Sequence, residues 1–380
     1  MTNDEVLLSK TVTALRFPLI VGVVFIHNNL ATGISVNGVV HGMDCPQWYY
    51  FIVNLISGTF ASATVPLFFF ISGFFFFYKS EFNNATYAKK LKSRFRTLFV
   101  PFLLWNLIAI LWQMKCYLPF FSSFCSPVDV QLSITRILNT FFWNTGNNGI
   151  FVEAGIEDTI SSLPYPINIP LWYLRDLMVM VILSPAVYWL VKYSRFRVVA
   201  IFSVIWFVSP LLFSDDNYFG QQLIVALLFY TWGGYYSIHN KNFCISFRDI
   251  KFVPYVYLVI AVFDAMTKNA DYNFVIHKIG IICGVISMVI IVSRLMESEK
   301  IRENLFLATS SFFVYACHIL ILSPLRKALY ALLHFGDDSP YAWLAFYLLI
   351  PCITIIVCLL LYMSLKKCTP SLLKILNGGR

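Results

Sequence analysis

The chain has 380 residues, of which 59% are hydrophobic and 12% are charged. Soluble globular proteins have about 45–50% apolar and about 25% charged residues, so this chain has too few polar side chains for a soluble body of its size. These values exclude a cytosolic enzyme, a nucleic-acid-binding protein, a disordered protein and a small disulfide-rich scaffold. The formal net charge of +9 therefore bears on membrane topology rather than on nucleic-acid binding.

The start of the chain does not resemble a cleavable signal peptide. It carries Asp4 and Glu5 and no apolar run, whereas a signal peptide has a basic start, a short apolar stretch and a small-residue cleavage site. We therefore expect the first hydrophobic segment to be retained as a membrane helix. The nine cysteines show no CxxC spacing, which argues against a metal or redox motif. Cys116 and Cys125 could pair within one outer loop, although we favour free thiols.

Ten stretches are long and apolar enough, or nearly so, to cross a bilayer as a helix, which takes about 20 residues. Two of them, 198–213 and 252–267, are short. A third, 48–78, is long enough to be tilted, broken or extended beyond the bilayer. The ten stretches are 11–31, 48–78, 97–118, 171–191, 198–213, 221–238, 252–267, 274–293, 306–333 and 341–365.

The positive charges divide unequally between the connections. With the N-terminus placed inside, 20 of the 28 Lys and Arg residues fall on inner connections and seven on outer ones. Cytoplasmic connections of membrane proteins carry such an excess of positive charge. The sequence thus predicts an all-α, polytopic membrane protein with about ten transmembrane helices and both termini in the cytoplasm.

One outer connection, 119–170, is much longer than the others. It contains an expected amphipathic helix at 130–143, a Gly/Asn turn at 144–149, an acidic cluster and a Pro-rich approach to the next helix. Long ordered loops are usually functional, but a surface flap fits these features equally well. Because no internal repeat is visible, we treat residues 1–380 as a single transmembrane domain with this long outer loop.

Two ionisable residues, Arg16 and His27, lie within the first predicted span, where such groups are costly and often functional. At about 100° per residue their spacing brings both side chains to one face of a helix, about 16 Å apart along it. We expect Arg16 near the cytoplasmic end and His27 past the midplane. Arginine offers a fork of donors to a phosphate or carbonyl, and neutral histidine accepts a hydroxyl proton because its ordinary pKa lies near neutral pH. The alternatives are an interfacial anchor for Arg16 and a buried, backbone-bonded histidine for His27.

Further short motifs follow the Arg16–His27 pair in a fixed order. They are the segments 65–74 (VPLFFFISGF), Arg94-Phe95-Arg96 with 100–105 (VPFLLW), 170–174 (PLWYL) and 311–318 (SFFVYACH). Together these motifs resemble acyltransferase family 3, whose first helix carries a basic residue, ten intervening residues and a histidine. Members of this family are bacterial integral membrane proteins that transfer acyl groups to cell-surface glycans and other acceptors. The resemblance extends from about residue 11 to about residue 320.

The resemblance implies a cytoplasmic acyl-CoA as co-substrate, and we expect no bound cofactor or metal. It implies that His27 has the central catalytic role and that Arg16 holds or polarises the donor. It also implies donor binding by the basic loop that contains Arg94 and Arg96. Many relatives carry an Arg-x-x-Arg pair there, whereas here Lys92, Arg94 and Arg96 are spaced by two. This departure leaves open which residue of the loop would bind a donor phosphate.

The other motif residues have two interpretations each. Trp172 and Tyr173, at an outer helix start, are either interfacial belt residues or a stacking surface for a sugar. His318, with Tyr315 one turn earlier, either supports the catalytic site or forms a packed polar pair. Ser72, which precedes a glycine, favours close helix packing over a nucleophilic role.

Two groups of charges near the long outer loop have a structural interpretation. Arg175 and Asp176 are favoured as a structural ion pair. Glu153, Glu157 and Asp158 could bind acceptor hydroxyls, but a solvated acidic loop is favoured.

The family resemblance and the Arg16–His27 pair together predict an O-acyltransferase, most simply an O-acetyltransferase, in the bacterial cytoplasmic (inner) membrane. It would move an acyl group from acyl-CoA to a hydroxyl of a surface polysaccharide or lipid-linked glycan. This transfer needs a base for the hydroxyl proton and a group that stabilises the oxyanion. Whether His27 acts as base or carries the acyl group stays open. The alternative is a non-enzymatic polysaccharide exporter, for which the Arg16–His27 pair has no obvious use.

Overall fold

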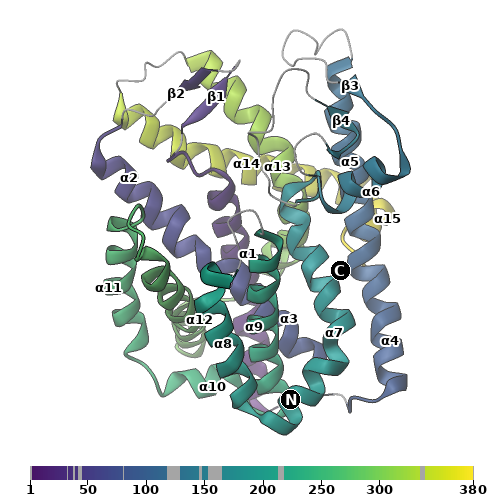
Figure 1. Ribbon diagram of the computed structural model, residues 1–380, viewed down its shortest axis with the longest axis vertical. Coiled ribbons are helices and arrows are strands. Elements are labelled where there is room, and N and C mark those ends of the chain that lie inside the picture. Colours follow the sequence, from purple (N-terminus) through teal and green to yellow (C-terminus); the bar gives the residue numbers. More distant parts are fainter. Residues whose placement is uncertain are drawn as a thin grey trace. The chain divides into compact units, whose positions relative to one another are not determined.

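The computed structural model shows a chain that is almost entirely helical (Figure 1). The described residues also form two short antiparallel strand pairs, β1 (Ile34–Val36) with β2 (Val39–His41) and β3 (Asp129–Val130) with β4 (Phe151–Val152). The structure describes residues 2–31, 33–36, 39–41, 45–79, 81–117, 129–144, 148–152, 165–212, 218–333 and 339–379.

The contacts divide the chain into two compact units. The first comprises Met1–Lys79 and Trp232–Ser364, and the second comprises Ser80–Thr231 and Leu365–Arg380. The chain passes from one unit to the other three times: between Lys79 and Ser80, within α9 (Tyr218–Ile238) and within α14 (Pro340–Cys368).

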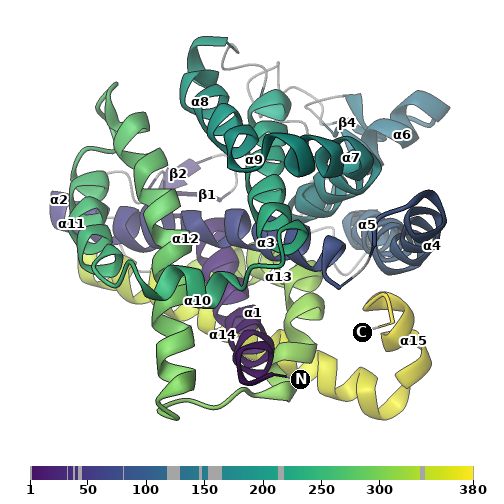
Figure 2. The same cartoon turned by 90° about the horizontal axis from the view of Figure 1, so that it is seen from below.

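The first unit is built around α1, which packs against α12, α13 and α3. Figure 2 looks along α1 and shows α10, α13 and α14 around it. Its buried residues recur at every third or fourth position, which is the pattern of a helix with one face in the core. They include Leu8, Val12, Leu15, Leu19 and Val23. The helices of this unit are α1 (Asn3–His27), α2 (Gln47–Val53), α3 (Thr64–Phe77), α10 (Phe243–Arg248), α11 (Val253–Met266), α12 (Asn273–Glu297), α13 (Leu305–Leu333) and most of α14.

Helix α1 begins at Asn3, well before the predicted start of the first span at residue 11. A capping box explains the early start, because the Thr2 side chain accepts from the Glu5 amide and the Glu5 carboxylate accepts from the Thr2 amide. As a result Arg16 lies near the middle of α1 rather than near its end. His27 is the last residue of the helix.

The predicted stretch 48–78 is one apolar helical segment of 31 residues, Gln47–Phe77, whose interior is not α-helical. A π-helix at Asn54–Phe60 and a short 3₁₀-helix at Ala61–Ala63 join α2 to α3. Such departures inside a helix often occur at functional sites. Here the π-helix buries two hydroxyls, those of Ser57 and Thr59.

The second unit contains a long helical segment that the sequence analysis treated as a basic loop. Helix α4 (Asn84–Arg94) starts after Asn83, whose side chain accepts from the Thr86 amide at 2.8 Å. A π-helix at Phe95–Phe99 then continues into α5 (Val100–Gln113). The expectation of a loop was wrong because Asn83 caps a run of good helix formers, Ala and Lys among them. The other helices of this unit are α6 (Ile134–Phe142), α7 (Trp172–Ser194), α8 (Phe196–Leu212), most of α9 and α15 (Pro370–Leu376).

The amphipathic helix expected at 130–143 is present as the shorter α6. It starts late because the Ser133 side chain caps it, accepting from the Arg136 amide at 3.1 Å. The Thr140 hydroxyl in α6 accepts from the Ile150 amide, and the Thr140 backbone carbonyl accepts from the Ile167 amide. These bonds connect the described parts of the long outer loop to one another. Cys125, residues 145–147 of the Gly/Asn turn, and the acidic Glu153, Glu157 and Asp158 lie outside the described residues.

Each of the ten predicted stretches overlaps a helix in the described part of the chain. Among the described residues, seven helical segments are long and apolar enough to cross a membrane. Phe196–Leu211 and Val253–Met266 are shorter apolar helices, as their predicted lengths indicated. The remaining stretch, 221–238, lies on α9. The seven segments are Asn3–His27, Gln47–Phe77, Asn84–Gln113, Ile169–Ser194, Asn273–Glu297, Leu305–Leu333 and Pro340–Cys368.

Polar contacts join several connections at one end of the first unit, where α1 starts. The division of Lys and Arg residues between the connections predicts that these same connections lie on the cytoplasmic side of the membrane. Figure 1 shows the start of α1 beside α10 at this end. The contacts are Lys79 Nζ to Glu5 Oε1 at 2.7 Å, Asn242 Nδ2 to the Asp4 carbonyl at 2.9 Å and Arg248 Nη1 to Glu297 Oε1 at 2.7 Å.

Close packing in the first unit depends on Gly233 in α9. A Cβ atom at this position would overlap the Phe70 carbonyl of α3 and lie 2.9 Å from the Phe74 nitrogen. Only a glycine allows this approach of two helix backbones.

Replacing Gly233 tests this packing. We expect Gly233→Ala to destabilise the protein by about 1–3 kcal/mol, because backbone atoms of α3 must move to admit the methyl group. Gly280→Ala is the control, since its Cβ would meet Ile260 Cγ2 at an ordinary 3.4 Å. Thermal unfolding of the purified protein in detergent measures both. Equal melting temperatures for the two variants would contradict the role of Gly233.

Candidate active site

Two histidines face each other inside the first unit. His27 ends α1, and His318 lies near the middle of α13. Their ring centroids are 5.2 Å apart, with the ring planes tilted by 48°. His318 is fully buried and His27 is partly buried. The structure thus brings together two residues that the sequence analysis named from separate motifs.

The backbone of α13 fixes the protonation pattern of His318. Its Nδ1 lies 2.7 Å from the Tyr315 carbonyl and 3.2 Å from the Val314 carbonyl. A carbonyl only accepts, so Nδ1 carries a hydrogen, and in the neutral ring the free lone pair is on Nε2. Nε2 is buried and has no hydrogen-bond partner in the described part of the chain. A buried polar atom without a partner points to a missing ligand or proton donor.

The end of α1 is held by side chains from two other segments. Ser57 Oγ, on the π-helix, donates to the Phe25 carbonyl at 2.7 Å. Since a hydroxyl has one hydrogen, the Tyr347 hydroxyl of α14 must donate to Ser57 Oγ, at 2.6 Å. Asn28 Nδ2 donates to the Tyr347 carbonyl at 2.9 Å. The Phe25 carbonyl thus accepts from Ser57 as well as from the Asn28 amide, and the Asn28 side chain ties the end of α1 to α14, so these contacts fix the position of His27.

Sequence reasoning missed the residues that hold α1. Asn28 had a readable signal, because asparagine after a helical run is a common cap. Ser57 and Tyr347 had none, since their roles depend on a π-helix and on a contact with α14 across 290 positions of the chain.

Arg16 lies on α1 outside the buried core of the first unit. It makes no hydrogen bond or ion pair with any residue that the structure describes. Its guanidinium is therefore available to an anionic ligand, and helix geometry keeps it on the face of α1 that carries His27.

The remaining predicted residues are divided between the units. Tyr315 is buried beside His318 and supports it through its carbonyl. Ser72 lies half-buried on α3. The second unit holds Trp172 and Tyr173 in the first turn of α7, Arg94 at the end of α4 and Arg96 on the following π-helix.

The ion pair expected between Arg175 and Asp176 is confirmed. Arg175 Nε lies 2.8 Å from Asp176 Oδ1, and both side chains are buried. Arg175 also donates to the Phe142 carbonyl of α6 at 2.9 Å. The pair thus ties the start of α7 to the long outer loop.

A basic cavity of about 600 Å³ lies within the second unit. Among the described residues, four cations and no side-chain carboxylate line it; the cations are Lys89, Lys92 and Arg96 from α4 and the π-helix, and Lys374 from α15. Such a site favours an anionic ligand. Arg94 is not among the lining residues.

The C-terminal segment closes one side of this basic cavity. Gly378 has a φ of +65°, and a Cβ there would lie 2.5 Å from the Thr97 carbonyl. Trp105 Nε1 donates to the Leu376 carbonyl at 3.1 Å, which holds α15 against α5. Sequence reasoning missed Lys374 and Gly378, although the Gly-Gly pair after a short helix signals a tight turn.

A second buried polar cluster joins α11, α12 and the π-helix of the first unit. Asp264 accepts from Thr59 at 2.6 Å, from Lys268 at 2.9 Å and from Asn273 at 3.0 Å. Burial lowers the pKa of Lys268, and its bonds to Asp264 oppose that shift. Because the Asp264 carboxylate is so well paired, we assign this cluster a structural role.

Residues 10–363 match the family model described as "Acyltransferase domain". The chain belongs to acyltransferase family 3. This confirms the family that the sequence motifs predicted, and the protein is a multi-pass membrane acyltransferase. It is 24% identical over 392 residues to the succinoglycan biosynthesis protein ExoH of Rhizobium meliloti (strain 1021), covering 98% of this chain and 92% of that protein. No solved structure is found to match the chain.

The anchoring of α1 can be tested at Ser57. Ser57→Ala leaves the Tyr347 hydroxyl without its buried acceptor, so we expect a loss of about 1–3 kcal/mol of stability. Ser62→Ala is the control, because Ser62 bonds only to the Gly58 carbonyl of its own helix and its loss costs less than about 1 kcal/mol. Thermal unfolding in detergent compares the two variants. A Ser57→Ala variant as stable as Ser62→Ala would show that this contact does not hold α1.

Proposed function

We propose that the protein is an O-acyltransferase that moves an acyl group, most simply acetyl, from cytoplasmic acyl-CoA to a hydroxyl of a surface polysaccharide or lipid-linked glycan. The observation that carries this proposal is the His27–His318 pair with its unpartnered Nε2. The name of the relative, a succinoglycan biosynthesis protein, supports a glycan acceptor.

The proposed orientation of the protein in the membrane follows from the unequal division of Lys and Arg residues between the connections. Ten helices cross the bacterial inner membrane as one transferase domain, with both termini in the cytoplasm. The joined connections at the start of α1 support this assignment, because they carry the basic residues expected inside. His27, at the other end of α1, then faces an acceptor that arrives from the outer side.

In the proposed reaction His27 acts on the acceptor hydroxyl. Its imidazole takes the hydroxyl proton while the oxygen attacks the thioester carbon, the carbon–sulfur bond breaks, and the CoA thiolate takes the proton. His318 is a positioning residue whose Nε2 accepts a hydrogen bond from protonated His27. A route in which His27 first carries the acyl group uses the same residues.

Positively charged side chains are proposed to bind the acyl-CoA donor. Arg16 polarises the thioester carbonyl or binds a donor phosphate. The basic cavity binds CoA phosphates, with Arg96 as the residue predicted from sequence that lines it. Trp172 and Tyr173 offer a stacking surface for the sugar, and Ser72 serves helix packing.

The role of His27 has a direct test. His27→Ala should lower the transfer of label from acetyl-CoA to glycan in membranes by roughly 10²–10⁴-fold, because general acid–base catalysis contributes about that much. His239→Ala, at the opposite end of the first unit, is the control and should keep its activity. Both proteins should have the melting temperature of the wild type. Full activity in a folded His27→Ala protein would overturn the mechanism.

The two arginines predicted to bind the donor can be separated. Arg96→Gln should raise KM for acetyl-CoA by about tenfold or more and leave kcat nearly unchanged, because it removes one charged hydrogen bond to a phosphate. Arg94→Gln removes the same charge from a residue that does not line the cavity, and its KM should change little. Steady-state kinetics at varied acetyl-CoA concentrations measure KM and kcat for both variants. Equal KM values for both variants would exclude the cavity as the donor site.

A further inference from the structure

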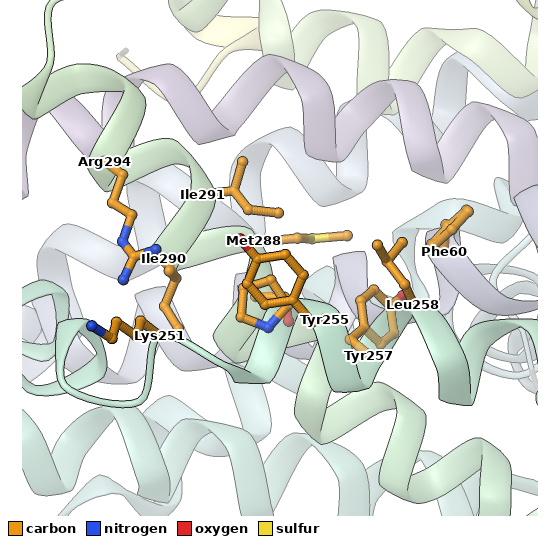
Figure 3. Close-up of a pocket in the computed structure, with 11 residues that line it drawn as sticks. Phe60, Lys251, Tyr255, Tyr257, Leu258, Met288, Ile290, Ile291 and Arg294 are labelled. Carbon is orange, nitrogen blue, oxygen red and sulfur yellow. The ribbon is translucent and has the colours of Figure 1, made fainter.

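A second cavity, of about 490 Å³, lies within the first unit between α11, α12 and the π-helix (Figure 3). Most of its wall is apolar, with Phe60, Leu258, Met288 and Ile291 as main contributors. We name it the α11–α12 groove. Its residues take no part in the proposed acyl transfer, so its purpose needs a separate explanation.

Two cations stand at one end of the groove. Lys251 precedes α11 and Arg294 lies in the last turn of α12, and these positions meet because the two helices form an antiparallel hairpin. Figure 3 shows both side chains together at one end and Phe60 at the other. Neither cation has a hydrogen bond or ion pair with a described residue, whereas the nearby Arg248 is paired with Glu297. Two adjacent positive charges without a counter-ion attract an anionic group.

Two buried hydroxyls in the groove wall also lack partners. Tyr257 is 5% exposed and Ser287 is 1% exposed, and neither hydroxyl oxygen has a hydrogen bond within the described residues. Ser287 precedes Arg294 by seven residues, two turns of α12, so both lie on the same helix face. A buried hydroxyl without a partner is costly, which indicates that a ligand acceptor belongs there.

These features match one kind of molecule from end to end. We propose that the α11–α12 groove binds an anionic phospholipid. Lys251 and Arg294 hold the headgroup phosphate, Tyr257 and Ser287 donate to the ester carbonyls, and an acyl chain lies along the apolar wall. Basic pockets between membrane helices on the cytoplasmic side bind anionic headgroups, and the proposed orientation places Lys251 and Arg294 on that side.

The choice of lipid follows from charge and polarity. A zwitterionic lipid leaves the two cations without a net counter-charge. A free phosphate ester leaves the apolar wall and both hydroxyls uncovered. An anionic phospholipid provides a partner for the two cations, for the two hydroxyls and for the apolar wall. Its binding should therefore depend on both the headgroup charge and the acyl chains.

The test measures lipid binding to the purified full chain by native mass spectrometry. The probes are dioleoyl phosphatidylglycerol, dioleoyl phosphatidylcholine and glycerol phosphate. The variant Lys251→Gln/Arg294→Gln should bind phosphatidylglycerol about tenfold or more weakly than the wild type, since two charged hydrogen bonds are lost. Lys300→Gln/Arg302→Gln removes the same charge from the next connection and should bind like the wild type. Glycerol phosphate should not compete.

A variant that keeps the packing gives a second, independent readout. Tyr257→Phe removes only the hydroxyl and should weaken phosphatidylglycerol binding severalfold. Phosphatidylglycerol should also raise the melting temperature of the wild type and not that of Lys251→Gln/Arg294→Gln. Equal binding of phosphatidylcholine, or equal losses in the two double variants, would overturn the proposal. The variant His27→Ala should bind the lipid normally, so failure of the proposed acyl transfer and failure of the lipid site are distinguishable.

Discussion

The candidate site of this protein depends on how one apolar helix, α1, ends. In lipid a backbone carbonyl has no water to bond, so every free carbonyl needs a partner from the protein. At the end of α1 the Phe25 carbonyl accepts from the Asn28 amide and from the hydroxyl of Ser57, and Tyr347 in turn bonds to Ser57. The contact that removes an energetic penalty therefore also sets the position of His27, beside His318. The hydrogen bonds that hold this helix thus also position the residue that we propose to be catalytic.

The two π-helical segments have related uses. In the first unit, Asn54–Phe60 carries the hydroxyls that reach α1 through Ser57 and Asp264 through Thr59. In the second unit, Phe95–Phe99 carries Arg96 into the wall of the basic cavity. A wider helical turn changes which side chains share a face, and each segment uses this change to present polar groups that a regular helix would direct elsewhere.

Hydropathy and motif spacing predicted much of this architecture. All ten stretches overlap described helices because a membrane span is marked by local composition, and the family follows from short motifs with fixed residues. His27, His318 and Tyr315 were named from sequence, but their meeting was not, because it depends on how α1 and α13 pack. The expectation of a basic loop failed for a local reason, since one cap at Asn83 turns that segment into a helix. Lys374 was missed because only tertiary packing brings α15 to the cavity that contains Arg96.

The bond from His318 to its own helix has a consequence for the path of protons. Because Nδ1 is hydrogen-bonded to the Tyr315 carbonyl, only Nε2 of the His318 ring can exchange a proton. A proton that binds at Nε2 therefore cannot leave through Nδ1. His318 is thus a terminus rather than a relay. In the proposed reaction, a proton taken from the acceptor would then be held by His27 and His318 until the departing sulfur takes it. In that reaction, attack on the thioester and departure of the sulfur are then coupled through one proton.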